Sequence, residues 1–209
     1  MIKVISFDIG GTLLQTNSID EYNLKKLTQI VGKQYDAVRY AYKTIFQKQK
    51  GTLEELVSKF TNLLEVEQNS NISDFFKEKF SEKNNISIID PNAQKLFKTL
   101  KNKGYKIILF SNSCCLLKND FSESLLKYID KIFYSYDIGY TKSDEESFKI
   151  VEKEMNVLGS EILHIGDTLK SDYINPIKYG WNALYYGKTD NRDIKTISEL
   201  NEIVKNVLF

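Results

Sequence analysis

The sequence predicts an α/β fold: a Rossmann-like parallel sheet with helices on both faces and an inserted all-α subdomain. Short apolar runs alternate with helical patterns at the start and over the second half of the chain. Such alternation is typical of parallel sheets with right-handed crossovers. After the first strand, about four consecutive helical patterns interrupt it. The length of 209 residues suits a core with one insertion of this kind.

Five short apolar runs are the predicted strands. In the first, Ile2, Val4, Ile5 and Phe7 cluster directly before a glycine pair, which indicates a short buried strand. The strands are expected at residues 2–7, 105–110, 131–134, 161–165 and 182–185.

Helical patterns separate and follow these strands. One helix is expected to begin at Asp90-Pro91, with Pro91 at its first position, and to end at Gly104. The others are expected at about residues 144–155, 169–179 and 198–208.

The insertion has its own helix signals. Ser18 with Glu21 and Thr52 with Glu55 have the spacing of capping boxes, which mark two helix starts. The Asn/Ser-rich segment 68–73 is expected to be a loop. The predicted division is a catalytic core of residues 1–14 and 86–209 and a helical subdomain of residues 15–85.

Composition limits the function classes. With 29 Lys+Arg against 28 Asp+Glu, the net charge of +1 gives no electrostatic case for nucleic acid or an anionic membrane. The adjacent Cys114 and Cys115 would gain little from a disulfide, and one histidine makes a zinc site improbable. We expect a cytoplasmic protein with reduced thiols; monomer and homodimer both remain open.

Four polar side chains follow four of the predicted strands. Asp8, Ser111, Lys142 and Asp167 each come just after an apolar run. Because the carboxyl ends of parallel strands line one crevice, we expect these side chains to converge there. Carboxylates, a hydroxyl and an ammonium group suit a phosphate ester with a bridging divalent cation.

The segments around these residues read Phe7-Asp8-Ile9-Gly10-Gly11-Thr12-Leu13, Ile107-Ile108-Leu109-Phe110-Ser111-Asn112, Lys142-Ser143-Asp144 and Gly166-Asp167-Thr168-Leu169-Lys170-Ser171-Asp172. They resemble the four motifs of the haloacid dehalogenase (HAD) superfamily, and the helical insertion resembles that family's C1-type cap. The resemblance covers the core, about two thirds of the chain, and in the insertion rests on position and helical pattern only.

The resemblance implies a role for each motif residue. Asp8 would be the nucleophile that forms an aspartyl-phosphate, with Ser111 and Lys142 holding the phosphoryl oxygens. Gly11, Thr12 and Asn112 would complete the substrate-binding loops, Thr12 and Asn112 by supporting their geometry. Mg²⁺ would be bound by Asp8, the Gly10 carbonyl, Asp167 and Asp172. The expected substrate is a small-molecule phosphate ester, and the expected activity a phosphatase.

One position departs from the family pattern. The second aspartate of the first motif is the family's general acid and base, and here it is Gly10. General acid–base catalysis contributes roughly 10²–10⁴-fold, so a slow enzyme is expected. A degenerate HAD-like protein that only binds ligand is the first alternative. A 2-haloacid dehalogenase is the second, although that branch uses no metal and lacks the acid that Asp167 supplies here.

Other polar and aromatic residues are expected to be structural. His164 lies in an apolar run and should be a core residue. Arg39, the only arginine of residues 15–85, is expected on a solvated helix face, although it could bind a substrate anion. The tyrosines of the insertion are expected to pack in its core: Tyr22, Tyr35, Tyr40 and Tyr42.

Overall fold

The computed structural model describes residues 1–15, 21–81, 88–117 and 121–206. A six-stranded sheet in the order β5-β4-β1-β6-β7-β8 forms its centre, and each neighbouring pair is parallel. Its strands are β1 (Val4–Phe7), β4 (Lys106–Ser111), β5 (Lys131–Tyr134), β6 (Ile162–Gly166), β7 (Asn182–Tyr186) and β8 (Thr196–Ile197). The five predicted strands are confirmed. The edge strand β8 was missed, because two residues carry no readable period.

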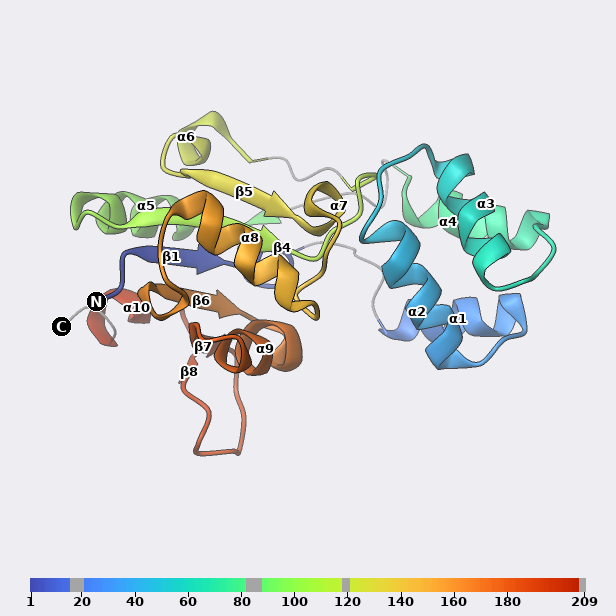
Figure 1. Ribbon diagram of the computed structural model, residues 1–209. Helices are drawn as coiled ribbons and strands as arrows, with labels where there is room; N and C mark the ends of the chain where they lie inside the picture. The colour runs from blue at the N-terminus through green and yellow to red at the C-terminus, as the bar shows by residue number, and fades with distance from the viewer. Residues whose placement is uncertain (16–20, 82–87, 118–120, 207–209) are drawn as a thin grey trace.

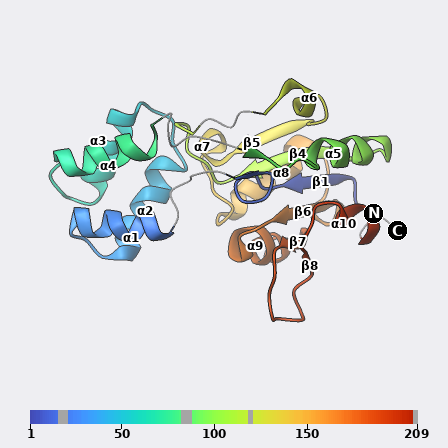
Figure 2. The same cartoon turned by 180° about the vertical axis from the view of Figure 1, so that it is seen from behind.

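Helices cover both faces of the sheet, as predicted (Figures 1 and 2). Alternate residues of β1 separate the two layers: Ile5 and Phe7 pack with α5, α6 and α10, whereas Val4 packs with α8. A strand buried on both faces, as all four residues of β1 are, is typical of such parallel sheets. The helices of the core are α5 (Ala93–Asn102), α6 (Glu123–Leu126), α7 (Ser135–Ile138), α8 (Glu145–Met155), α9 (Asn175–Lys178) and α10 (Glu202–Asn206).

Three expected helix boundaries are wrong. The last helix, expected at about 198–208, begins only at Glu202. Helix α5 begins at Ala93 rather than at Pro91, because an Asp90 side-chain oxygen accepts a hydrogen bond from the Asn92 amide and forms a turn. The segment expected as one helix at 169–179 is a π-helical turn at Leu169–Ile174 followed by α9. Wide turns of this kind are frequent at functional sites.

The insertion folds as four helices with their own hydrophobic cluster, which includes Phe46, Phe60 and Phe76. Of the tyrosines expected there, Tyr42 is buried in the cluster and Tyr35 packs against it, whereas the expectation is wrong for the exposed Tyr22 and Tyr40. We call these helices the helical subdomain: α1 (Glu21–Val31), α2 (Tyr35–Phe46), α3 (Leu53–Leu63) and α4 (Ser70–Lys79). It lies beyond the ends toward which the strands of the sheet point, whereas the N-terminus and α10 lie at the opposite end of the core (Figure 1).

The capping box at Thr52 and Glu55 is confirmed, with hydrogen bonds of 3.3 and 2.8 Å. Ser18 lies outside the described residues. The expected loop at 68–73 is wrong, because α4 already begins at Ser70. The Asn69 side chain accepts a hydrogen bond from the Ile72 amide at 3.1 Å and so caps that helix.

The chain enters and leaves the helical subdomain through a short antiparallel ribbon. Strand β2 (Leu14–Gln15) pairs there with β3 (Ile88–Ile89). The free thiols of Cys114 and Cys115, in the loop after β4, pack against the subdomain's hydrophobic cluster. The domain boundaries at 14/15 and 85/86 stay a prediction. Among the described residues, every helix is too short or too polar to cross a membrane.

Candidate active site

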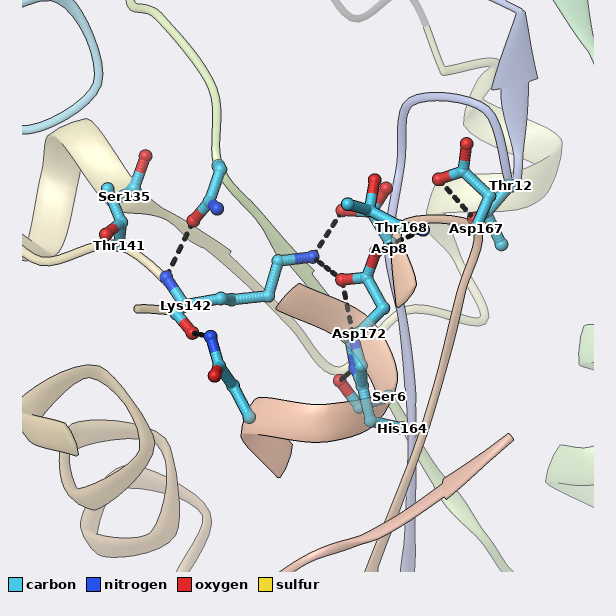
Figure 3. Close-up of polar contacts among 12 residues, drawn as sticks. Ser6, Asp8, Thr12, Ser135, Thr141, Lys142, His164, Asp167, Thr168 and Asp172 are labelled. Carbon is cyan, nitrogen blue, oxygen red and sulfur yellow. Dashed lines mark hydrogen bonds and ion pairs between the residues drawn. The ribbon is translucent and has the colours of Figure 1, made fainter. Parts of the chain in front are cut away.

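Three of the four residues predicted from the strand ends, Asp8, Lys142 and Asp167, lie together at one edge of the sheet (Figure 3). Phe7 pairs with Leu109 on one side and Ile165 on the other, so the loops after β1, β4 and β6 begin side by side. Carboxylate oxygens of Asp8, Asp167 and Asp172 lie within 4.8 Å of one another. We call these three residues the acidic triad.

Lys142 connects two members of the triad. Its ammonium group is 2.6 Å from an Asp8 oxygen and also contacts an Asp172 oxygen (Figure 3). The Lys142 side chain is fully buried. The structure therefore places the predicted cation directly against the predicted nucleophile.

Two asparagines hold the backbone of Lys142. Its amide donates to Asn112 Oδ1 at 2.7 Å, and its carbonyl accepts from Asn175 Nδ2 at 2.6 Å. Asn112 thus positions the lysine loop, which is the supporting role expected for it. Asn175 was missed, because it is a single polar residue in the segment after the fourth motif.

Ser111 ends β4 at this edge of the sheet and is buried. Within the part of the chain that the structure describes, its hydroxyl forms no hydrogen bond with another side chain or backbone group. This leaves the hydroxyl available to donate to a phosphoryl oxygen, as the sequence predicts for this position.

Burial and mutual repulsion shape the ionisation of the triad. Burial, with smaller contributions from Asp172 and Asp167, raises the pKa of Asp8 to about 7, although Lys142 opposes the shift. Burial also raises the pKa of Asp167, and Asp172 adds to it. Burial acts on Asp172 in the same direction, but Lys142 and a hydrogen bond from His164 outweigh it, so the pKa of Asp172 lies below its ordinary value.

A chain of buried polar contacts lies behind Asp172. Ser6 Oγ is 2.8 Å from His164 Nδ1, and His164 Nε2 is 3.1 Å from the Asp172 oxygen that Lys142 also contacts. Burial is the main reason why the pKa of His164 falls to about 4, so its ring is neutral and donates to Asp172. The expectation of a core histidine is confirmed, but this contact was missed. The available signal was that Ser6 and His164 are polar residues in apolar strands and pair directly across β1 and β6.

Gly11 and Gly166 let the carboxylates approach the backbone. Gly11 has φ 78°, and a Cβ atom there would lie 2.0 Å from an Asp167 oxygen. A Cβ atom at Gly166 would lie 2.5 Å from the Asp172 carboxyl carbon. The Thr12 hydroxyl also lies near Asp167, at 3.5 Å. The structure thus places Gly11 and Thr12 against an acidic group of the triad.

We expect Gly11→Ala to abolish activity and metal binding. The new methyl group would displace Asp167 and would also strain a left-handed backbone. Activity and the change of melting temperature on adding Mg²⁺ are the measurements. Gly32→Ala is the matched control, because Gly32 has φ 69° and nothing within 4 Å of its Cβ position. The control should lose stability alone, and a Gly11→Ala protein that behaves like it would contradict this account.

Gly10 differs from Gly11 in its backbone. It is absent from the positive-φ glycines, so its conformation is open to other residues. Among the described residues, no fourth carboxylate joins the acidic triad. The structure therefore places no further carboxylate in that group to replace the acid that Gly10 lacks.

Helix α8 has no side-chain cap at its N-terminus. Asp144 occupies the position before α8, but its side chain makes no cap bond. It accepts instead from the Thr141 amide and hydroxyl at 2.8 and 2.9 Å, and it pairs with Lys48 of the helical subdomain at 2.7 Å. The charge of Asp144 thus links the loop of Lys142 to the segment that follows α2.

The acidic triad fits a hard divalent cation. Its donors are all carboxylate oxygens, the ligand type that Mg²⁺ prefers. Burial and, to a smaller extent, the neighbouring carboxylates raise the pKa of Asp8 and Asp167, and a bound cation would favour the ionised form of both.

Fold and site define an α/β protein with an acidic triad and a buried lysine at the carboxyl edge of its parallel sheet. The family model of haloacid dehalogenase-like hydrolases matches residues 2–174. The chain belongs to this family.

Solved structures of the same fold include different enzymes. A predicted phosphoglycolate phosphatase from Haemophilus somnus 129PT is 17% identical, with coverage of 98% of this chain and 97% of that chain and a TM-score of 0.59. The 2-haloacid dehalogenase from Pseudomonas syringae pv. Tomato DC3000 is also 17% identical, with coverage of 98% and 97% and a TM-score of 0.63. These similarities show the fold alone.

A HAD family enzyme from Bacteroides thetaiotaomicron, solved in complex with magnesium and inorganic phosphate, is 18% identical. The match covers 92% of this chain and 98% of that chain, with a TM-score of 0.59. No curated protein matches this chain.

Proposed function

We propose that this protein is a Mg²⁺-dependent phosphatase that hydrolyses a small phosphorylated metabolite through an aspartyl-phosphate on Asp8. The observation that carries the proposal is the acidic triad beside a buried lysine that contacts Asp8 at 2.6 Å. Both Asp167 and Asp172 belong to the triad, which favours metal-assisted phosphoryl transfer over metal-free dehalogenation. The magnesium and phosphate bound by the relative from Bacteroides thetaiotaomicron support the same choice.

The residues of this chain divide the reaction between them. Lys142 and Ser111 hold the phosphoryl oxygens, and an Asp8 oxygen attacks phosphorus while the bond to the leaving oxygen breaks. Water then attacks the phosphorus of the aspartyl-phosphate, which releases inorganic phosphate and restores Asp8. Asp8, the Gly10 carbonyl and Asp167, with Asp172 close by, would hold the magnesium ion. When bound, the ion supplies charge neutralisation at the phosphoryl oxygens.

The helical subdomain would act as a cap that excludes water and bulky polymers from this site. Its contacts with loops near the site support this role. Lys48 pairs with Asp144, Lys50 pairs with Asp137, and the Cys115 thiol is 3.5 Å from the Gly51 carbonyl. A small-molecule substrate suits an enclosed site better than a protein does.

The second candidate is a HAD-like protein that binds a phosphorylated ligand and turns it over weakly or not at all. Gly10 is the specific observation in its favour, because glycine cannot transfer a proton to the leaving group. Turnover of an aryl phosphate in the presence of Mg²⁺ distinguishes the two candidates, since an aryl leaving group needs little protonation.

We expect activity to vanish in EDTA and to return on adding Mg²⁺. Mg²⁺ should also raise the melting temperature by ~5–10 °C at about 100 times its Kd, because it binds only the folded state. Differential scanning calorimetry measures this shift independently of turnover. Asp167→Asn should remove the shift, whereas Asp74→Asn, at an exposed position of α4, should keep it. Full activity in EDTA would overturn the metal-dependent mechanism.

A further inference from the structure

One face of α2 carries two cationic side chains, four residues apart in the sequence, so they are neighbours on the helix surface. Arg39 and Lys43 are one helical turn apart, and both are half-buried. Across residues 1–15, 21–81, 88–117 and 121–206, neither forms an ion pair with a carboxylate. Like charges at this spacing repel each other, so the arrangement opposes folding unless another charge compensates it.

The end of α2 lies against the loops of the active site. Lys48, just after α2, pairs with Asp144 at 2.7 Å, and Asp144 is two residues beyond Lys142 in the chain. Figures 1 and 2 both show the C-terminal end of α2 beside the core. The two cations therefore lie on a helix whose C-terminal end is linked to the loop of Lys142 through Lys48 and Asp144.

The surroundings of Lys43 are mainly cationic. Burial lowers the pKa of Lys43, and Arg39, Lys170 and Lys48 lower it further, whereas Asp144 raises it. Lys170 is three residues beyond Asp167 and Asp144 is two residues beyond Lys142, so charges from two of the core loops that carry the site act on Lys43. Asp144, the anion in this group, is already paired with Lys48. A half-buried ammonium group among cations needs a counterion from elsewhere.

A polar acceptor follows on the same side of α2. Gln47 comes one turn after Lys43, and its side-chain oxygen is buried with no hydrogen-bond partner among the described residues. Buried polar atoms are nearly always paired, so an unpaired one calls for a donor that the protein itself does not supply.

We propose that Arg39, Lys43 and Gln47 form a second anion-binding site, which holds an anionic group on the leaving-group side of the substrate. This inference rests on the proposed phosphatase function and narrows its substrate class. The substrate is a phosphomonoester that also bears a carboxylate or a second phosphate. Arg39 and Lys43 pair with that anion, and Gln47 accepts a hydrogen bond from a hydroxyl or amino group beside it.

The test compares phenyl phosphate esters that differ only in the para substituent: carboxylate, phosphonate or neutral carboxamide. The ratio of kcat/KM between an anionic ester and the carboxamide ester is measured for the wild type and Lys43→Met. Comparing the two proteins cancels the intrinsic reactivity of each ester. We expect the ratio to fall by about 10–100-fold in Lys43→Met, the scale of a lost charge-assisted hydrogen bond. Whether the carboxylate or the phosphonate ester shows the larger fall identifies the anion.

Lys77→Met, an exposed position on α4, is the matched control and should keep the wild-type ratio. Arg39→Gln should lower the ratio in the same direction as Lys43→Met. The melting temperature of Lys43→Met should not fall, because the change removes an unpaired ammonium group, whereas a purely structural lysine would lower it. An unchanged ratio in Lys43→Met, with all esters hydrolysed, overturns this inference and leaves the phosphatase proposal standing.

If no ester is hydrolysed in the presence of Mg²⁺, the phosphatase proposal fails. Binding then tests the anion site by itself. The probe is 4-phosphonobenzoate, which carries both anionic groups on a non-hydrolysable frame, and calorimetry gives its Kd. A larger Kd for Lys43→Met than for the wild type and Lys77→Met supports the second anion-binding site. Equal Kd values in all three proteins overturn it.

Discussion

Asp8→Asn is expected to lower kcat on the order of 10⁴-fold or more, the scale seen when a catalytic nucleophile is removed. The amide has the shape of the carboxylate but cannot attack phosphorus. Folding should survive, because Lys142 keeps its contact with Asp172. The buried carboxylate of Asp8 has a raised pKa, so its charge opposes folding at neutral pH, and its removal should not lower the melting temperature.

Steady-state hydrolysis of an aryl phosphate and a thermal melt of the same sample are the two measurements. Asp74→Asn is the control for the substitution itself, since its side chain is exposed on α4. Mass spectrometry of acid-quenched enzyme should find a phosphoryl group on the wild type and none on Asp8→Asn. Wild-type turnover by Asp8→Asn would eliminate the aspartyl-phosphate mechanism.

Gly10→Asp is expected to raise the turnover of alkyl phosphates by up to ~10²–10⁴-fold, the contribution of general acid catalysis. Without a proton donor at residue 10, the leaving group departs as an anion or takes a proton from water. The wild-type rate should therefore depend steeply on leaving-group acidity, and aryl phosphates should gain much less from the new carboxyl group. The backbone favours the experiment, because positive φ belongs to Gly11 rather than to Gly10.

The measurement is kcat/KM across aryl and alkyl phosphates of graded leaving-group acidity. Gly10→Asn is the matched control, because it adds nearly the same volume without a transferable proton. A gain shared by both variants would mean that loop geometry, rather than proton transfer, limits the rate. A wild-type rate independent of leaving-group acidity, with phosphoryl transfer limiting, would show that another group already supplies the proton.

The absence of an acid at residue 10 raises the question of whether the proposed second anion-binding site assists the leaving group. Lys43 lies on the leaving-group side in our proposal, and burial with neighbouring cations lowers its pKa. The leaving-group series should therefore be repeated with Lys43→Met. A steeper dependence in that variant than in the wild type would indicate that the lysine also assists departure of the leaving group.

Local patterns were sufficient for the central strands and for the position of most site residues. A strand such as β1, with four consecutive buried residues, can be recognised from its apolar run. Asp8 and Asp167 could then be placed together without coordinates, because neighbouring parallel strands carry their following loops to one edge. Short elements such as α7 and β8, of four and two residues, were missed because each spans about one period of its pattern, so no repeat can be seen.

The sequence by itself thus determined the sheet, the helical insertion and the set of acidic and basic groups at one edge, since these depend on periodicity and chain order. Only the tertiary structure decided which groups touch. The contact of His164 with Asp172, the approach of Gly11 to Asp167 and the position of Arg39 and Lys43 on α2 depend on register and packing. Side chains more than a hundred residues apart, such as Lys142 and Asp8, meet within 2.6 Å because parallel strands align their ends. No local pattern encodes that distance, because packing of the whole core fixes it.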